Sequence, residues 1–154
     1  MLPSLQRYLP RLGRRWKPLD FSNPNFVRKP GSEKIEEESI LDYVASQFYP
    51  TRIGEIIKGR YQVVVGKLGF GTTSTAWLAR DIDARRHVTF KIFTNSMSMG
   101  QQLDGELNMF KRMEKGSKHC HGHHYFRNLL GSFEIDKSSA KHVCLVYPPL
   151  WVSV

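Results

Sequence analysis

The sequence predicts an α+β fold in which five antiparallel strands form one sheet and a single helix packs beside it. Short apolar runs separated by polar turns are typical of hairpin-connected strands, and they occupy much of the chain after residue 60. Only the segment 101–115 has a strong helical spacing of apolar residues. The length of 154 residues allows one domain and an arm, which excludes a large multidomain enzyme.

Composition narrows the function only slightly. The formal net charge of +9 is compatible with nucleic acid, anionic lipid or phosphate ligands. No apolar run is long enough to span a membrane. Two cysteines, Cys120 and Cys144, are too few for a disulfide scaffold and favour a reducing compartment.

Residues 1–48 are predicted to form a basic, irregular and loosely packed arm and linker. The first 19 residues contain no acid, and Leu5, Leu9, Leu12 and Trp16 form one helical stripe. This pattern is typical of a mitochondrial transit peptide or a membrane-surface helix, but Pro10 interrupts it, and a disordered basic arm fits equally. Further on, the glutamates 36–38 indicate either a short helix or a solvated charge run before a docking turn.

The remaining elements follow in order along the chain. Alternating apolar residues predict a first strand, and a glycine-rich turn connects it to the second. A polar turn at 81–86 precedes the third strand. In the helix 101–115, the residues Leu103, Leu107, Phe110 and Met113 share a face, and Gly116 is the expected C-cap. The five expected strands are 61–68, 75–79, 87–93, 129–135 and 142–147.

The glycine turn is the first feature that indicates chemistry. Its sequence, Gly69-Phe70-Gly71-Thr72-Thr73-Ser74, has serine where a G-x-G-x-x-G motif has its third glycine. A Rossmann fingerprint requires a helix after the glycines, whereas a strand follows here. A glycine hairpin lets backbone N–H groups approach phosphate oxygens closely, although a plain tight hairpin explains the turn equally well on its own.

Two charged residues favour the phosphate interpretation. Lys91 lies inside an apolar strand, where an ammonium is costly without a partner, and Glu106 lies on the helix that follows. A glycine hairpin, a strand lysine and a helix glutamate occur in this order in the ATP-holding half of a protein kinase. A sheet-edge lysine and an exposed helix acid are the simpler alternatives.

Longer motifs resemble one kinase family. The segments 50–55, 59–61, 67–71 and 74–78, followed by Asp81, are similar to the start of the SR-protein kinases, the serine/threonine kinases of arginine–serine-rich splicing factors, and of fungal members in particular. Serine at the third glycine position, followed by Thr-x-Trp-Leu, is the most specific part. The resemblance covers 49–154 and extends loosely back to residues 16–18. It implies a protein-kinase N-lobe that ends just after the hinge.

The resemblance also implies a set of ATP-binding residues. Lys91 would pair with the α- and β-phosphates and Glu106 would hold Lys91. Tyr147 would gate the back of the pocket, while the Pro148 carbonyl and the Leu150 N–H would contact adenine. The full set is Leu68, Gly69, Phe70, Gly71, Thr72, Thr73, Ser74, Ala76, Thr89, Lys91, Glu106, Tyr147, Pro148 and Leu150.

Three departures from the family pattern concern this pocket. Thr89 replaces the usual alanine, so its hydroxyl needs a partner, and Ala76 replaces the usual valine. The stretch at 63–65 is one residue longer than expected. Because side chains alternate along a strand, we expect a β-bulge there.

The sequence contains neither an H-R-D catalytic loop nor a D-F-G motif, so no catalytic or metal-binding residue is assigned. We therefore expect the chain to be inactive by itself, with Mg²⁺ required only in an intact kinase that acts on arginine–serine-rich proteins. The family resemblance implies that the protein is located in the cytoplasm or nucleus, whereas the arginine-rich amphipathic N-terminus implies a mitochondrial location as the alternative.

Other features of the sequence bear on three functions other than ATP binding. A non-catalytic interaction or regulatory module derived from a kinase is the main alternative. The loop 119–124, with four histidines and Cys120, has metal-ligand types at unfavourably tight spacing. Specific nucleic-acid binding lacks aromatic platforms, because the basic arm offers only Trp16 and Phe21.

Overall fold

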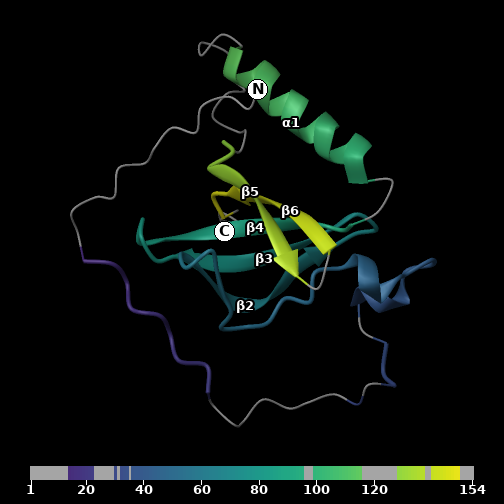
Figure 1. Ribbon diagram of the computed structural model, residues 1–154, viewed down its shortest axis with the longest axis horizontal. Coiled ribbons are helices and arrows are strands. Elements are labelled where there is room, and N and C mark those ends of the chain that lie inside the picture. The colour runs from purple at the N-terminus through teal and green to yellow at the C-terminus, as the bar shows by residue number, and fades with distance from the viewer. Residues whose placement is uncertain are drawn as a thin grey trace, which may run out of the picture.

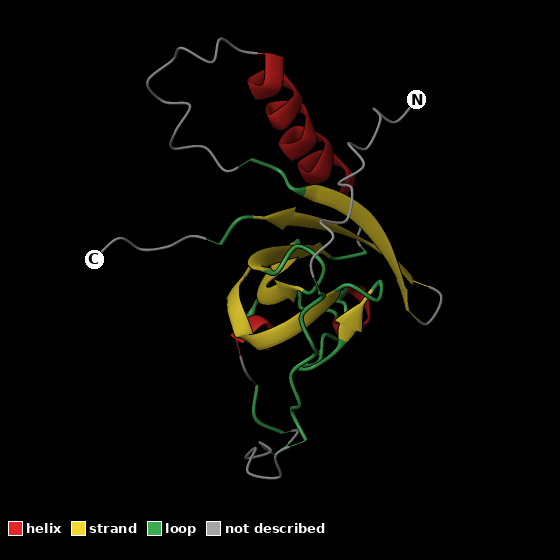
Figure 2. Cartoon of the chain, turned by 90° about the vertical axis from the view of Figure 1, so that its left-hand side faces the viewer, coloured by secondary structure: helices red, strands yellow, loops and turns green. Residues whose placement is uncertain are grey.

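The computed structural model describes residues 14–22, 30, 32–34, 36–95, 99–115, 128–137 and 140–149. These residues form one antiparallel sheet, with helix α1 (Met99–Lys115) along one face near strands β5 and β6 (Figure 1). In the side view the sheet is strongly curved, and the helix lies outside the curve (Figure 2). The described part of the chain contains no helix long and apolar enough to cross a membrane.

The sheet contains six strands where the sequence predicts five. The additional strand is β1 (Ile56–Ile57), a two-residue edge strand that pairs with the start of β2. It is too short to produce a periodic pattern, which is why sequence analysis missed it. The order in the sheet is β1-β2-β3-β4-β6-β5. The other strands are β2 (Tyr61–Phe70), β3 (Ser74–Asp81), β4 (Arg86–Phe93), β5 (Gly131–Lys137) and β6 (Ala140–Tyr147).

The expected bulge in the first long strand is confirmed. Along β2 and β3 the pairing shifts register between Val63 and Lys67, and again between Lys67 and Gly69. Three consecutive residues from Tyr61 to Val63 are buried, so the simple in-and-out alternation is broken at the start of this strand. The bulge absorbs the extra chain length and increases the local twist of the hairpin that carries the glycine turn.

Two apolar clusters lie on opposite faces of the sheet. The larger one contains Val88, Phe90 and Ile92 of β4, and Tyr61 packs against Phe90 and Phe133 with ring centroids 5.0 and 5.5 Å away. The smaller one lies beneath α1 and contains Phe93, Leu145 and Tyr147, with Leu103, Leu107 and Phe110 of the helix packed against them. Alternation along β4 therefore places Lys91 and Thr89 on the helix-facing side.

Residues 14–22 of the arm contact the sheet through a few hydrogen bonds. Gln62 is buried, and its side-chain amide accepts a hydrogen bond from the Leu19 N–H and donates one to the Leu19 carbonyl, both at 2.8 Å. The backbone N–H of Trp16 donates a hydrogen bond to the Ile82 carbonyl at 3.0 Å, and the guanidinium carbon of Arg80 lies 4.4 Å from the centre of the Trp16 ring. These contacts attach residues 14–22 to the sheet at a few points, while seven of the nine residues are exposed, so the prediction of a loosely packed arm is not contradicted. No local pattern in the sequence indicates the contact with the buried Gln62. Residues 1–13, and with them most of the expected amphipathic stripe, lie outside the described part.

One ion pair fixes the far end of the β2–β3 hairpin. Arg60 donates two hydrogen bonds to the carboxylate of Asp81, at 2.8 and 2.7 Å, and the Ala84 N–H donates a third at 3.1 Å. Burial alone would raise the pKa of Asp81, but the hydrogen bonds from Arg60 and Ala84 outweigh it and hold the pKa below its usual value. Asp81 is thus a buried structural carboxylate.

Candidate functional site

Strand register brings the predicted pocket residues onto one face of the sheet. In the ladder, Lys91 lies opposite Ala76 on β3 and opposite Leu145 on β6. Thr89 lies opposite Leu78 and Tyr147 in the same way. Since directly opposed residues of antiparallel strands point to the same side, these side chains share the face on which α1 packs.

Lys91 and Glu106 form an ion pair on this face. The Lys91 Nζ lies 2.5 Å from Glu106 Oε2, and these side chains are 33% and 18% exposed. The ammonium also lies 5.0 Å from the centre of the Phe93 ring, within cation–π range. The pairing offsets the cost of placing an ammonium in an apolar strand, and it connects helix α1 to β4.

A third side chain completes the arrangement around the carboxylate. The hydroxyl of Tyr147 donates a hydrogen bond to Glu106 Oε1, so each carboxylate oxygen has its own partner. The ring of Tyr147 also packs 5.6 Å from that of Phe110 on α1. The sequence identified Tyr147 as a pocket residue, but nothing in the sequence revealed the contact of its hydroxyl.

The glycine turn connects β2 and β3 as predicted. Its backbone is closed by a hydrogen bond from the Gly71 N–H to the Ser74 carbonyl at 2.9 Å. A Cβ placed on Gly69 would meet nothing within 4 Å, and one on Gly71 would meet only the Ser74 carbonyl oxygen at 3.9 Å. The packing of the chain does not require glycine at either position, and both have φ in the range open to other residues. The open space above the backbone leaves room for a ligand to approach its N–H groups.

The sequence indicates that the hydroxyl of Thr89 needs a partner, and the described residues supply none. The residue is 4% exposed, and within the described residues its Oγ1 has no hydrogen-bond partner. Such a group costs free energy in the absence of a ligand. Ala76 lies opposite Lys91, and its small side chain fills little of the space on this face.

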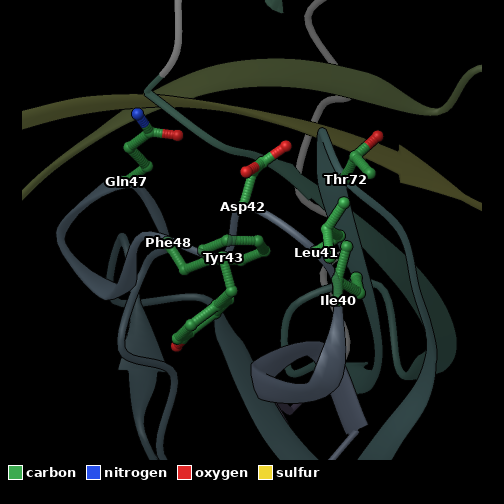
Figure 3. Close-up of a pocket in the computed structure, with 7 residues that line it drawn as sticks. All are labelled: Ile40, Leu41, Asp42, Tyr43, Gln47, Phe48 and Thr72. Carbon is green, nitrogen blue, oxygen red and sulfur yellow. The ribbon is translucent and has the colours of Figure 1, made fainter.

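A separate hollow of about 260 Å³ lies beside the glycine turn, next to Thr72 (Figure 3). Its walls come mainly from the segment around two short 3₁₀ helices, η1 (Glu36–Ser39) and η2 (Ala45–Gln47). The segment is fixed by a hydrogen bond from the Asn95 N–H to the Gln47 carbonyl at 2.8 Å and by an ion pair between Lys67 and Glu36 at 3.0 Å. The short helix predicted at the glutamates is therefore a single 3₁₀ turn. The residues lining the hollow are Ile40, Leu41, Asp42, Tyr43, Gln47, Phe48 and Thr72.

The predicted site residues thus fall into three groups. Thr89, Lys91, Glu106 and Tyr147 are brought together with Ala76 on one face, and Leu68 to Ser74 form the end of the adjoining hairpin. Pro148 follows β6 directly, while Leu150, like the histidine-rich loop 119–124 and Gly116, lies outside the described residues. The described residues contain no cluster of three or more metal-ligating side chains. Sequence analysis missed Gln102 and Thr94, which hold the glycine turn; the helical spacing of Gln102 from Glu106 is the one signal that could have identified Gln102.

Comparison with known proteins identifies the family. The chain is 34% identical over 130 residues to a serine/threonine protein kinase of Aspergillus fumigatus, covering 84% of this chain and 32% of the relative. It is 32% identical over 116 residues to SRSF protein kinase 3 of mouse, and the match covers 75% of this chain and 20% of the mouse protein. For protein kinase dsk1 of Schizosaccharomyces pombe the identity is 32% over 117 residues, and the match covers 76% of this chain and 22% of dsk1. The chain is a homologue of the SR-protein kinases.

This homology confirms the family indicated by the glycine-turn motifs. The chain spans about a third of the length of the Aspergillus kinase and about a fifth of the mouse SRSF protein kinase. No family model matches it. The antiparallel sheet with one helix is compatible with the N-lobe of a kinase, and the relatives support a kinase-related function.

Proposed function

We propose that this chain is the ATP-binding N-lobe of a serine/threonine protein kinase of the SR-protein kinase type. The Lys91–Glu106 ion pair at 2.5 Å is the observation that supports the proposal most directly. In protein kinases the strand lysine pairs with the α- and β-phosphates while the helix glutamate holds it. Both residues occur here at the expected places, on the face next to the glycine turn.

The surrounding residues fit a nucleotide. The open backbone of the glycine turn offers N–H groups for phosphate oxygens, and the face between Ala76, Thr89 and Tyr147 is where the base would lie. The unpartnered hydroxyl of Thr89 gains a partner if the base supplies one. After β6, Pro148 keeps a carbonyl acceptor although it has no N–H to donate.

For the activity of a whole kinase, we propose transfer of the ATP γ-phosphate to serines of arginine–serine-rich proteins, in line with the relationship to the SRSF protein kinases. We assign none of the 154 residues to the catalytic aspartate or the magnesium ligands of that reaction, because the sequence contains neither an H-R-D nor a D-F-G motif. What these residues contribute is the binding and orientation of the phosphates.

Thermal unfolding of the 154-residue chain with and without millimolar ADP tests nucleotide binding. A ligand that binds only the folded state raises its stability, by about 1.4 kcal/mol at tenfold excess over Kd, or roughly 3–6 °C for a chain of this size. Lys91→Met should abolish the shift. Lys141→Met is the matched control, because Lys141 is exposed and only loosely paired with Glu134 at 3.8 Å. The proposal fails if the wild-type chain shows no shift with several millimolar ADP.

A further inference from the structure

The tip of the glycine turn makes direct contact with helix α1. The hydroxyl of Thr73 donates a hydrogen bond to the side-chain oxygen of Gln102, which lies in the first turn of the helix. Although it lies at the end of a hairpin, Thr73 is only 9% exposed. The turn is therefore packed against the rest of the molecule.

The backbone of Thr73 is fixed separately. Its carbonyl accepts hydrogen bonds from the N–H of Thr94 at 2.8 Å and from the Thr94 hydroxyl at 3.3 Å. Thr94 is buried directly after β4. Thr94, the residue after β4, therefore holds the backbone of Thr73, while the Thr73 hydroxyl is directed to α1.

Gln102 and Glu106 are four residues apart, and residues at this spacing lie on the same face of a helix, one turn from each other. One of them contacts the glycine turn, and the other contacts Lys91 and Tyr147. A single helix face thus touches both groups to which we assign phosphate binding. A shift of α1 would displace the turn and the lysine together.

We propose that Gln102 is a positioning residue for the phosphates: by binding the Thr73 hydroxyl, it ties the glycine turn to the helix that sets Lys91. This inference rests on the proposed function, because it assumes that the turn and Lys91 bind the phosphates of a nucleotide. Gln102 itself does not touch the nucleotide. Its effect is to reduce the motion of the turn, so that less entropy is lost when phosphates bind.

Two conservative variants remove the contact without altering the apolar core. Thr73→Val keeps the branched shape but lacks the hydroxyl, and Gln102→Ala removes the acceptor from a largely exposed position. Gln101→Ala is the matched control, since Gln101 is also exposed but points about 100° away around the helix. The double variant shows whether the two residues act through one contact.

The first measurement needs no nucleotide. Amide hydrogen exchange of the peptide covering residues 68–78 should be faster in Thr73→Val and in Gln102→Ala, equally fast in the double variant, and unchanged in Gln101→Ala. Unchanged exchange in both single variants would overturn the proposal, because the contact would then not hold the turn.

The second measurement compares ADP with adenosine, which has the same base and ribose but no phosphates. Loss of one hydrogen bond should weaken ADP affinity about three- to tenfold and leave adenosine affinity unchanged. Equal weakening of both ligands, or no weakening of ADP, would refute the positioning role. If the wild-type chain binds neither ligand, the proposed function and the phosphate role both fail, whereas the exchange data still report on the contact itself.

Discussion

The hydroxyl of Tyr147 donates a hydrogen bond to Glu106, the residue whose other carboxylate oxygen accepts one from Lys91. The end of β6, the middle of β4 and the centre of α1 therefore meet at one carboxylate. The Tyr147 hydroxyl restrains the Glu106 carboxylate, and Glu106 in turn orients the Lys91 ammonium. Preorganisation of this kind reduces the free-energy cost of binding.

Replacing Tyr147 with phenylalanine tests this relationship. The change keeps the ring, which packs against Phe110, and removes the hydroxyl that binds Glu106. A hydrogen bond to a charged group contributes about 1.5–3 kcal/mol, and the partial exposure of Glu106 puts the expected loss of unfolding free energy near the lower value. Urea unfolding measures it. Tyr61→Phe is the control; the prediction is wrong if both variants lose the same amount.

The contribution of the Arg60–Asp81 pair is tested by Asp81→Asn. Asp81 is fully buried, so its replacement leaves Arg60 without its charged partner. Because the Arg60 side chain is 30% exposed, we expect a loss of unfolding free energy of about 2 kcal/mol, below the value for a fully buried pair. Asp136→Asn changes an exposed strand carboxylate and should cost less than about 0.5 kcal/mol. A similar, small effect of both substitutions would show that the pair contributes little.

The Asp81 carboxylate should also make the free energy of unfolding depend on pH. Because the pKa of Asp81 is lower in the folded chain than in the unfolded one, the unfolded state binds more protons as the pH falls below about 4. The stability that Asp81 contributes is therefore fully present at neutral pH and is lost in acid. Urea midpoints measured from pH 6 to pH 2 should fall more steeply for the wild type than for Asp81→Asn. Parallel curves would contradict the prediction.

The docking of the arm is tested at Gln62. Replacing this buried residue with leucine removes both hydrogen bonds to the Leu19 backbone. We expect residues 14–22 to detach, which would expose the bond after Arg15 to trypsin, since Arg15 is held by Gly59 and Asp83 when docked. The cleavage rate at this bond should rise at least several-fold, whereas Gln101→Leu should leave it unchanged. An unchanged rate in Gln62→Leu would show that other contacts hold the arm.

Much of the sheet could be predicted from the sequence because its strands are long and periodic. The helix and five strands follow from local patterns. The irregular register near Val63–Lys67 follows from the one residue that the chain has there beyond the family pattern. The candidate site followed from the order of the glycine turn, Lys91 and Glu106. What could not be predicted depends on contacts between distant residues: the two-residue strand β1, the Gln62–Leu19 bonds, and the contacts of Thr73 and Tyr147 with α1. None of these leaves a periodic trace in the sequence.

Thr89 offers a test in which removing a polar group should stabilise the protein. Its hydroxyl is buried and, among the described residues, has no partner, so Thr89→Val should raise the unfolding free energy by about 1–2 kcal/mol at constant shape. Thr75→Val is the matched control, because the equally buried hydroxyl of Thr75 accepts a hydrogen bond from Trp77 Nε1 at 3.0 Å. This variant should lose about 1 kcal/mol. Urea denaturation of both variants should show a higher unfolding free energy for Thr89→Val and a lower one for Thr75→Val. A destabilised Thr89→Val would mean that the Thr89 hydroxyl has a partner.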